Sequence, residues 1–214
     1  MNQAEFLDIP SLHSDGKGYR VVFEREKENL NLDKSQQKLF ENLYVKIQED
    51  PQKHLAALIE FCSLHPKVPE AANLLAFAYL RLKKKKEAED LIEKTYLAHP
   101  DYLIARINYA DQALRLKKKE LVPMIFDRCF DLNRLYPKKE SFHYSEFRGF
   151  MTLMGFYHLE IGEKEKAEEY YQLAFQVDPL HPSVAALEKK LSKTSFLKKI
   201  FRTLQKLAPI SKNP

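Results

Sequence analysis

The chain has 214 residues, of which 44% are hydrophobic and 30% charged, and its net charge is +5. This composition supports one domain or one elongated array with a real core. Only 5 glycines are present, too few for a β-rich fold full of tight turns or for a glycine loop around a phosphate. The longest apolar run, residues 74–80, falls far short of the roughly 18 to 20 residues that span a bilayer.

The beginning of the chain and its cysteines predict a location inside the cell. Glu5 and Asp8 lie where a secretory signal would carry positive charge and then an uninterrupted apolar stretch. Cys62 and Cys129 both fall within apolar helical patterns, so we expect buried free thiols in a reducing compartment. We therefore predict a cytoplasmic protein.

Residues 1–33 show no helical pattern. Residues 15–18, "DGKG", predict a turn, and residues 19–23, "YRVVF", predict a brief extended piece. The alternation of apolar and polar residues is short and charged residues follow at once. This region is therefore predicted to be an N-terminal arm that is partly extended or disordered.

A period of 34 residues runs through the middle of the chain. Pro66 and Pro100 are 34 residues apart and each follows a histidine, and "RLK" at residues 81–83 returns at residues 115–117. Pro179 follows Pro100 at a distance that fits two more periods and an insertion of about eleven residues. The chain is therefore predicted to contain internal repeats.

One period resolves into two amphipathic helices, at about residues 69–82 and 86–98, which a run of lysines joins. Small residues such as Ala76 and Ala88 let the two helices approach closely, and a proline ends the second helix. In these features the chain resembles the tetratricopeptide repeat family. The matching residues are Leu75, Ala76, Tyr79, Ala88, Ile92, Thr95 and Pro100 in one unit, and Met154, Gly155, His158, Ala167, Tyr171, Ala174 and Pro179 in another.

The resemblance implies an all-α solenoid of three to four tetratricopeptide-like helical hairpins. It also implies a repeat domain over residues 34–181 with a C-terminal capping helix. The expected units are 35–66, 69–100, 103–137 and 145–179.

Two of these units depart from the family pattern. The first is divergent, and in it we expect Asp50 to cap a helix that starts at Pro51. The third has Val122 where a small residue belongs and Pro123 in the first turn of its second helix. The insertion is expected in or after residues 132–145.

In the family, the first helix of each unit lines a concave groove that binds a peptide or a partner helix. The resemblance places these positions on three units, and the structural alternative is that Phe77, Leu80 and Phe156 only pack between units. A further alternative places the N-terminal arm in the groove as an internal ligand. The predicted groove residues are Asn73, Phe77, Leu80, Arg81, Ile107, Asn108, Asp111, Arg115, Thr152, Phe156 and Leu159.

The lysine runs recur at the repeat period, so they are predicted to be turns between paired helices. Stacked repeats would place both turns on one edge and form a patch that steers an acidic partner. Nucleic acid is disfavoured, because these turns contain no aromatic residue on which a base would stack. The edge residues are Lys83, Lys84, Lys85, Lys86, Lys117, Lys118 and Lys119.

Residues 182–214 are predicted to form a capping helix followed by a basic amphipathic tail. All of the excess positive charge lies after residue 188, and Val184, Leu187 and Leu191 share one helical face that would cover the last repeat. The tail has three open uses: it continues the cap, lies on an anionic membrane, or docks into a partner or a second copy of the chain. Its cationic residues include Lys198, Lys199, Arg202 and Lys206.

No linear motif of catalysis or metal binding is present, and no histidine has a partner at metal-ligand spacing. We therefore expect no enzyme, no cofactor and no metal. The predicted function is a non-enzymatic protein-interaction module, an adaptor or chaperone-like protein, whose partner is a peptide or helix. The alternative is a peripheral membrane protein, or less readily a nucleic-acid-associated one, that uses the tail and the lysine turns. Homo-oligomerisation is left open.

Overall fold

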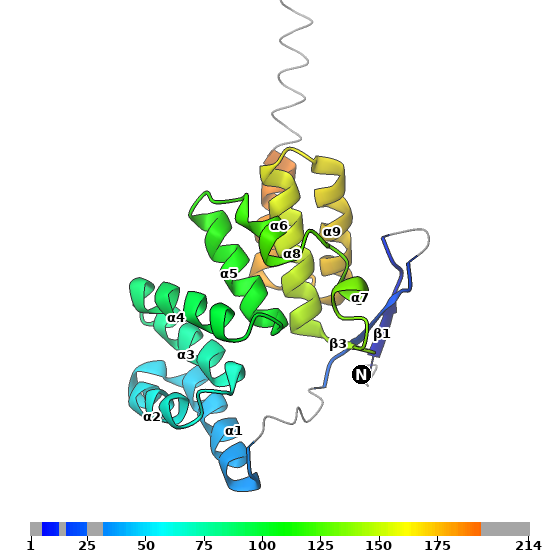
Figure 1. The fold of residues 1–214 in the computed structure, drawn as a ribbon. Coiled ribbons are helices and arrows are strands. Elements are labelled where there is room, and N and C mark those ends of the chain that lie inside the picture. The colour runs from blue at the N-terminus through cyan, green and yellow to red at the C-terminus, as the bar shows by residue number, and fades with distance from the viewer. Residues whose placement is uncertain (1–5, 13–15, 25–31, 194–214) are drawn as a thin grey trace, which may run out of the picture. The chain divides into compact units, whose positions relative to one another are not determined.

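The computed structural model describes residues 6–12, 16–24 and 32–193 (Figure 1). These residues fall into two compact units. The repeat unit comprises residues 23–138, and the terminal unit joins residues 1–22 to residues 139–214. The cationic tail residues Lys198, Lys199, Arg202 and Lys206 lie outside the described residues.

The repeat unit is a stack of helical hairpins. Each helix from α1 to α6 packs against the next, and first helices also contact one another, α1 with α3 and α3 with α5. The predicted all-α class with tetratricopeptide-like helical hairpins is confirmed. The helices are α1 (Lys34–Glu49), α2 (Pro51–Leu64), α3 (Pro69–Arg81), α4 (Lys85–Ala98), α5 (Leu103–Arg115), α6 (Leu121–Ile125) and α7 (Leu132–Leu135).

Local sequence explains where the first hairpin begins and turns. Asp33 Oδ1 accepts hydrogen bonds from the backbone N–H groups of Ser35 and Gln36 at 2.8 and 2.9 Å, and Gln36 Oε1 accepts from the Asp33 N–H, which completes a capping box. Asp50 caps α2 and Pro51 occupies its first turn, as predicted. Aromatic stacking of Phe40 on Phe61, with ring centroids 5.5 Å apart, joins α1 to α2.

Three hairpin turns share one backbone geometry. Lys83, Lys117 and Gly162 follow α3, α5 and α8 with φ of 59°, 62° and 87°. In each turn the next residue donates its N–H to a carbonyl five residues back, as Lys84 does to Tyr79 at 2.9 Å and Glu163 does to His158 at 2.8 Å. This is the Schellman geometry, which favours glycine at the left-handed position. Two of the three turns nevertheless place a lysine there.

Lys83→Gly and Lys117→Gly are each expected to raise the free energy of unfolding by about 0.5 to 1 kcal/mol, because glycine adopts a positive φ without a steric penalty. Gly162→Lys is expected to lower it by about 1 kcal/mol. No atom lies within 4 Å of the position that a Cβ at Gly162 would take, so this cost is conformational. Urea denaturation followed by circular dichroism measures each change. A Lys83→Ala variant should stay near wild type, and equal stability of Lys83→Ala and Lys83→Gly would contradict the argument.

The third repeat lacks a full second helix, contrary to the expected helix pair over residues 103–137. Helix α6 ends at Ile125, Asp127 and Arg128 both adopt a positive φ (52° and 56°), and only the four-residue α7 follows. Pro123 lies in the first turn of α6, where a proline is tolerated, so it does not explain the break. The left-handed pair ends the helix, and contacts described below hold that pair in place.

The terminal unit combines the two ends of the described chain. A three-stranded sheet of β1 (Phe6–Ile9), β2 (Tyr19–Val22) and β3 (Phe142–His143) has the order β1-β2-β3. β1 and β2 are antiparallel, whereas β2 and β3 are parallel, with Val21 opposite Phe142. The helices of this unit are α8 (Tyr144–Glu160), α9 (Lys164–Val177) and a helix that includes residues 182–193.

The extended piece predicted at residues 19–23 is present as β2, but the described N-terminal strands pack into a core and do not form a separate arm. Ile9, Tyr19 and Val21 are buried, and the Tyr19 ring packs edge-on against Phe147 of α8 at 5.2 Å. The alternation looked too short for a stable strand because its parallel partner, β3, lies about 120 residues later. The described strands pack within the terminal unit and form part of its core.

The helix over residues 182–193 covers α8. Val184, Leu187 and Leu191, which the sequence assigned to a cap, are buried. A Cβ on Gly155 would come within 2.4 Å of Leu187 Cδ2, so glycine at this position allows the close approach of the two helices.

Candidate protein-interaction surface

Helices α3 and α5 bring most of the predicted groove residues of the repeat unit together. The two helices contact each other, and Asn108 Nδ2 donates a hydrogen bond to Asn73 Oδ1 at 2.6 Å. The pair joins equivalent faces of two successive first helices. Because both amides are only half-buried, they retain donor and acceptor capacity for an approaching backbone.

Phe77, Leu80 and Arg81 extend this surface along α3. Leu80 is 45% exposed, and Phe77 is half-buried with the Arg81 guanidinium 5.7 Å from its ring centroid. Arg81 also donates a long hydrogen bond of 3.4 Å to the Gln48 carbonyl at the end of α1. The apolar surface therefore lies beside a cation at the end of α3.

On α5, Asp111 and Arg115 form an exposed ion pair with Nε and Oδ2 2.9 Å apart. Ile107, by contrast, is buried, so it belongs to the core and presents no side chain to a partner. We call the accessible set the α3–α5 face: Asn73, Phe77, Leu80, Arg81, Asn108, Asp111 and Arg115.

The remaining predicted groove residues belong to α8 of the terminal unit. Thr152 is buried, so it is not available as a surface contact. Phe156 is half-buried, and the Lys190 ammonium lies 5.1 Å from its ring centroid. Leu159 is also half-buried. Phe156 and Leu159 thus belong to a different compact unit from the α3–α5 face.

The lysine runs lie at one end of the repeat unit. Gln112, in the last turn of α5, donates from Nε2 to the Glu89 carbonyl of α4 at 3.3 Å, which places the end of α5 beside the start of α4. Lys85 forms an ion pair of 3.6 Å with Glu89 along α4. All seven lysines of the two turns are exposed. We call this set the lysine edge: Lys83, Lys84, Lys85, Lys86, Lys117, Lys118 and Lys119.

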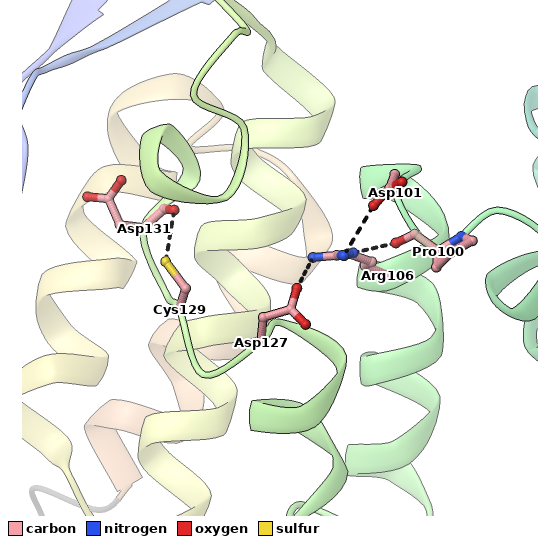
Figure 2. Close-up of polar contacts among 6 residues, drawn as sticks. All are labelled: Pro100, Asp101, Arg106, Asp127, Cys129 and Asp131. Atoms are coloured by element: carbon pink, nitrogen blue, oxygen red, sulfur yellow. Dashed lines mark hydrogen bonds and ion pairs between the residues drawn. The ribbon is translucent and has the colours of Figure 1, made fainter.

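A buried arginine, to which the repeat pattern gave no pointer, organises the third repeat. Arg106 of α5 has a side chain only 10% exposed, donates to the Pro100 carbonyl, and pairs with Asp127 at 3.0 Å and with Asp101 at 3.6 Å (Figure 2). It thereby ties the α4–α5 connection to the left-handed residues after α6. The available signal was a cation within a buried stripe, between Ala105 and Ile107.

Two side chains that could support catalysis, the Cys62 thiol and the His158 ring, are packed within the fold. Burial raises the pKa of Cys62 to about 12, so this thiol is a poor nucleophile. Both cysteines are free, as predicted, but half-buried rather than buried. Burial also lowers the pKa of His158, although its hydrogen bond of 2.8 Å to Glu163 opposes that shift. Its ring stacks on Tyr170.

The described residues contain neither a metal-binding cluster nor a membrane-spanning helix. No group of three or more His, Cys, Asp or Glu side chains in that part of the chain is arranged to hold a metal ion. None of the helices there combines the length and the apolar character that crossing a membrane requires.

Comparisons with known proteins yield likenesses of fold. No protein-family model matches the sequence, and no curated protein does. A solved structure titled "MamA RS-1 ArsTM double mutant" is 18% identical, with a TM-score of 0.46 over 76% of this chain and 96% of that chain. A second, "MamA 41-end from Desulfovibrio magneticus RS-1", is 17% identical, with a TM-score of 0.46 over 83% of this chain and 98% of that chain. At these scores the likeness carries no functional argument.

Proposed function

We propose that the chain is a tetratricopeptide repeat protein that acts as a non-enzymatic interaction module, an adaptor or chaperone-like protein. Its partner is a protein segment, which binds on the α3–α5 face. The Asn73–Asn108 pair carries this proposal, because it links two successive first helices through half-buried amides beside the accessible Leu80.

The α3–α5 face combines the two kinds of contact that a bound segment needs. Leu80 and the half-buried Phe77 offer apolar area, whose removal from water stabilises a complex by about 25 cal/mol per Å². The two asparagine amides can pair with the backbone of a bound segment, which would otherwise lose hydrogen bonds to water. Such a face suits an extended or helical segment better than a small molecule.

The test is quantitative affinity capture from the protein's own cells with a neutral substitution, Leu80→Gln. Its matched control is Leu180→Gln, which makes the same change at a residue 91% exposed in the terminal unit. We expect Leu80→Gln to reduce recovery of one specific protein about fivefold to tenfold, because the variant loses apolar contact area, whereas the control leaves recovery unchanged.

Unfolding curves of both variants establish that they are folded. Equal recovery with Leu80→Gln and wild type would refute the α3–α5 face as the docking site. A truncation after Lys193 provides the second arm. The contrary result is recovery of the full chain, but not of the truncated chain, in the membrane fraction, with no effect of Leu80→Gln. That result would replace the proposed function with the alternative of a membrane-associated protein.

A further inference from the structure

We propose that the lysine edge is a second binding site, which holds an acidic segment of the same protein partner. The proposal rests on the proposed function and names the chemistry of the partner. Its central contacts are Lys83 and Lys117, the two lysines in left-handed conformation, and neighbouring lysines add charge around them.

The position of the lysine edge connects it to the α3–α5 face. Arg81 ends α3 and Arg115 ends α5, and each is followed two residues later by a left-handed lysine. The Gln112–Glu89 hydrogen bond keeps the two turns at the same end of the repeat unit. A segment that leaves the α3–α5 face at this end therefore meets cations on both turns.

Backbone conformation supplies an independent reason to assign these lysines a role. The same turn geometry contains glycine at residue 162, the residue type that a positive φ favours. Neither Lys83 nor Lys117 is required by the turn, since its hydrogen bonds are made by backbone groups. Lysine therefore stands at both left-handed positions although the turn geometry favours glycine, which fits a role of these side chains in recognition.

The surroundings favour an acidic protein segment over other anions. Residues 81–88 and 115–121 contain no aromatic side chain on which nucleic-acid bases would stack. Leu116 is the one exposed large apolar residue in these two stretches, which offers little for insertion into a membrane interface. Carboxylates that approach from the α3–α5 face would meet exposed ammonium groups without having to bury them, so desolvation costs little.

The experiment measures binding of a fluorescein-labelled ten-residue glutamate peptide to the full chain by fluorescence anisotropy at low and moderate salt. The edge variant is Lys83→Gly with Lys117→Gly. The control variant, Lys189→Gln with Lys193→Gln, removes the same charge from exposed residues of the terminal unit. Vesicles of phosphatidylcholine and phosphatidylserine and a single-stranded DNA of about 20 nucleotides are the competing probes.

We expect the edge variant to bind the glutamate peptide about tenfold more weakly than wild type while its melting temperature rises by a few degrees. The control variant should bind as wild type does. Weaker binding in a more stable protein separates a role in recognition from a role in folding. Wild-type binding should also weaken as salt is raised.

Three results would overturn the proposal: unchanged peptide binding by the edge variant, an equal loss in the control variant, or a loss confined to the vesicles or the DNA. Leu80→Gln separates this proposal from the proposed function, because it is expected to leave binding of the glutamate peptide unchanged. If the edge variant loses capture of the partner and Leu80→Gln does not, the α3–α5 face is not the docking site, whereas the lysine edge remains a binding site.

Discussion

Replacing Phe147 with alanine is expected to lower the free energy of unfolding of the terminal unit by about 3 to 5 kcal/mol. The Phe147 side chain is fully buried, and its ring meets the Tyr19 ring of β2 edge-on, with centroids 5.2 Å apart and planes at 60°. The substitution removes the apolar contacts of the ring and leaves a cavity between α8 and the sheet. Its effect should therefore reach the N-terminal strands as well as α8.

Urea denaturation followed by circular dichroism measures this loss, and hydrogen exchange of the amides of β2 reports it locally. Phe175→Ala is the matched control, because Phe175 of the same unit is 42% exposed and should lose less than about 1 kcal/mol. A double-mutant cycle with Tyr19→Ala should give a coupling energy of about 1 kcal/mol. A loss for Phe147→Ala no larger than that of the control would show that the sheet does not share a core with α8.

Replacing Arg106 with leucine is expected to lower the free energy of unfolding of the repeat unit by about 2 to 3 kcal/mol. The guanidinium donates hydrogen bonds to the Pro100 carbonyl and to Asp127 and forms an ion pair with Asp101. Leucine has no hydrogen-bond donor to replace them. Asp127 is 69% exposed, so it can be rehydrated when the partner is removed, which keeps the loss below that of a fully buried ion pair. Residues 127 and 128 should then leave their left-handed conformation.

Arg115→Leu provides the control on the same helix. Arg115 forms only an exposed ion pair with Asp111 one turn away, so its loss should stay within about 0.5 kcal/mol. Arg106→Lys should recover little, because a single ammonium cannot reproduce the fork of donors. Increased hydrogen exchange after α6 is the structural readout. If Arg106→Leu behaves as Arg115→Leu does, then Arg106 does not hold this part of the chain.

The helical hairpins were predictable because their determinants are local. The helical spacing of apolar residues, the lysine turn and the closing proline all lie within one repeat of 34 residues. Asp50 and Pro51 likewise fix the start of α2 by contacts within one turn. Such signals need no knowledge of distant parts of the chain.

The sheet and the broken third repeat depend on distant partners. Tyr19 and Val21 are buried only because β3 and α8 lie against them, and a short amphipathic stretch gives no sign of that cover. Residues 127 and 128 fell within the helix pair expected over residues 103–137, whereas Arg106, about twenty residues earlier, contacts Asp127 in its left-handed conformation.

The surface was predictable in part. Repeat spacing identified the accessible positions of α3 and α5, but it also included Ile107 and Thr152, which are buried. Periodicity places a residue on a helix face, whereas neighbouring helices decide how much of that face remains open. The left-handed conformation of Lys83 and Lys117 follows from their φ values and not from the sequence of the turns. The one sequence signal was Gly162 at the equivalent position of the third turn.

The pairing of β2 with β3 sets an order of events during synthesis. The N-terminal strands leave the ribosome first, but β3 and α8 are made about 120 residues later. The helical hairpins of residues 34–115 depend on contacts close in sequence and can form as they emerge. The apolar side chains of Ile9, Tyr19 and Val21 therefore lack the cover of β3 and α8 while the intervening chain is made. During that interval the nascent chain carries the edge of β2 that later pairs with β3, and an unpaired strand edge is a site at which chains can associate wrongly.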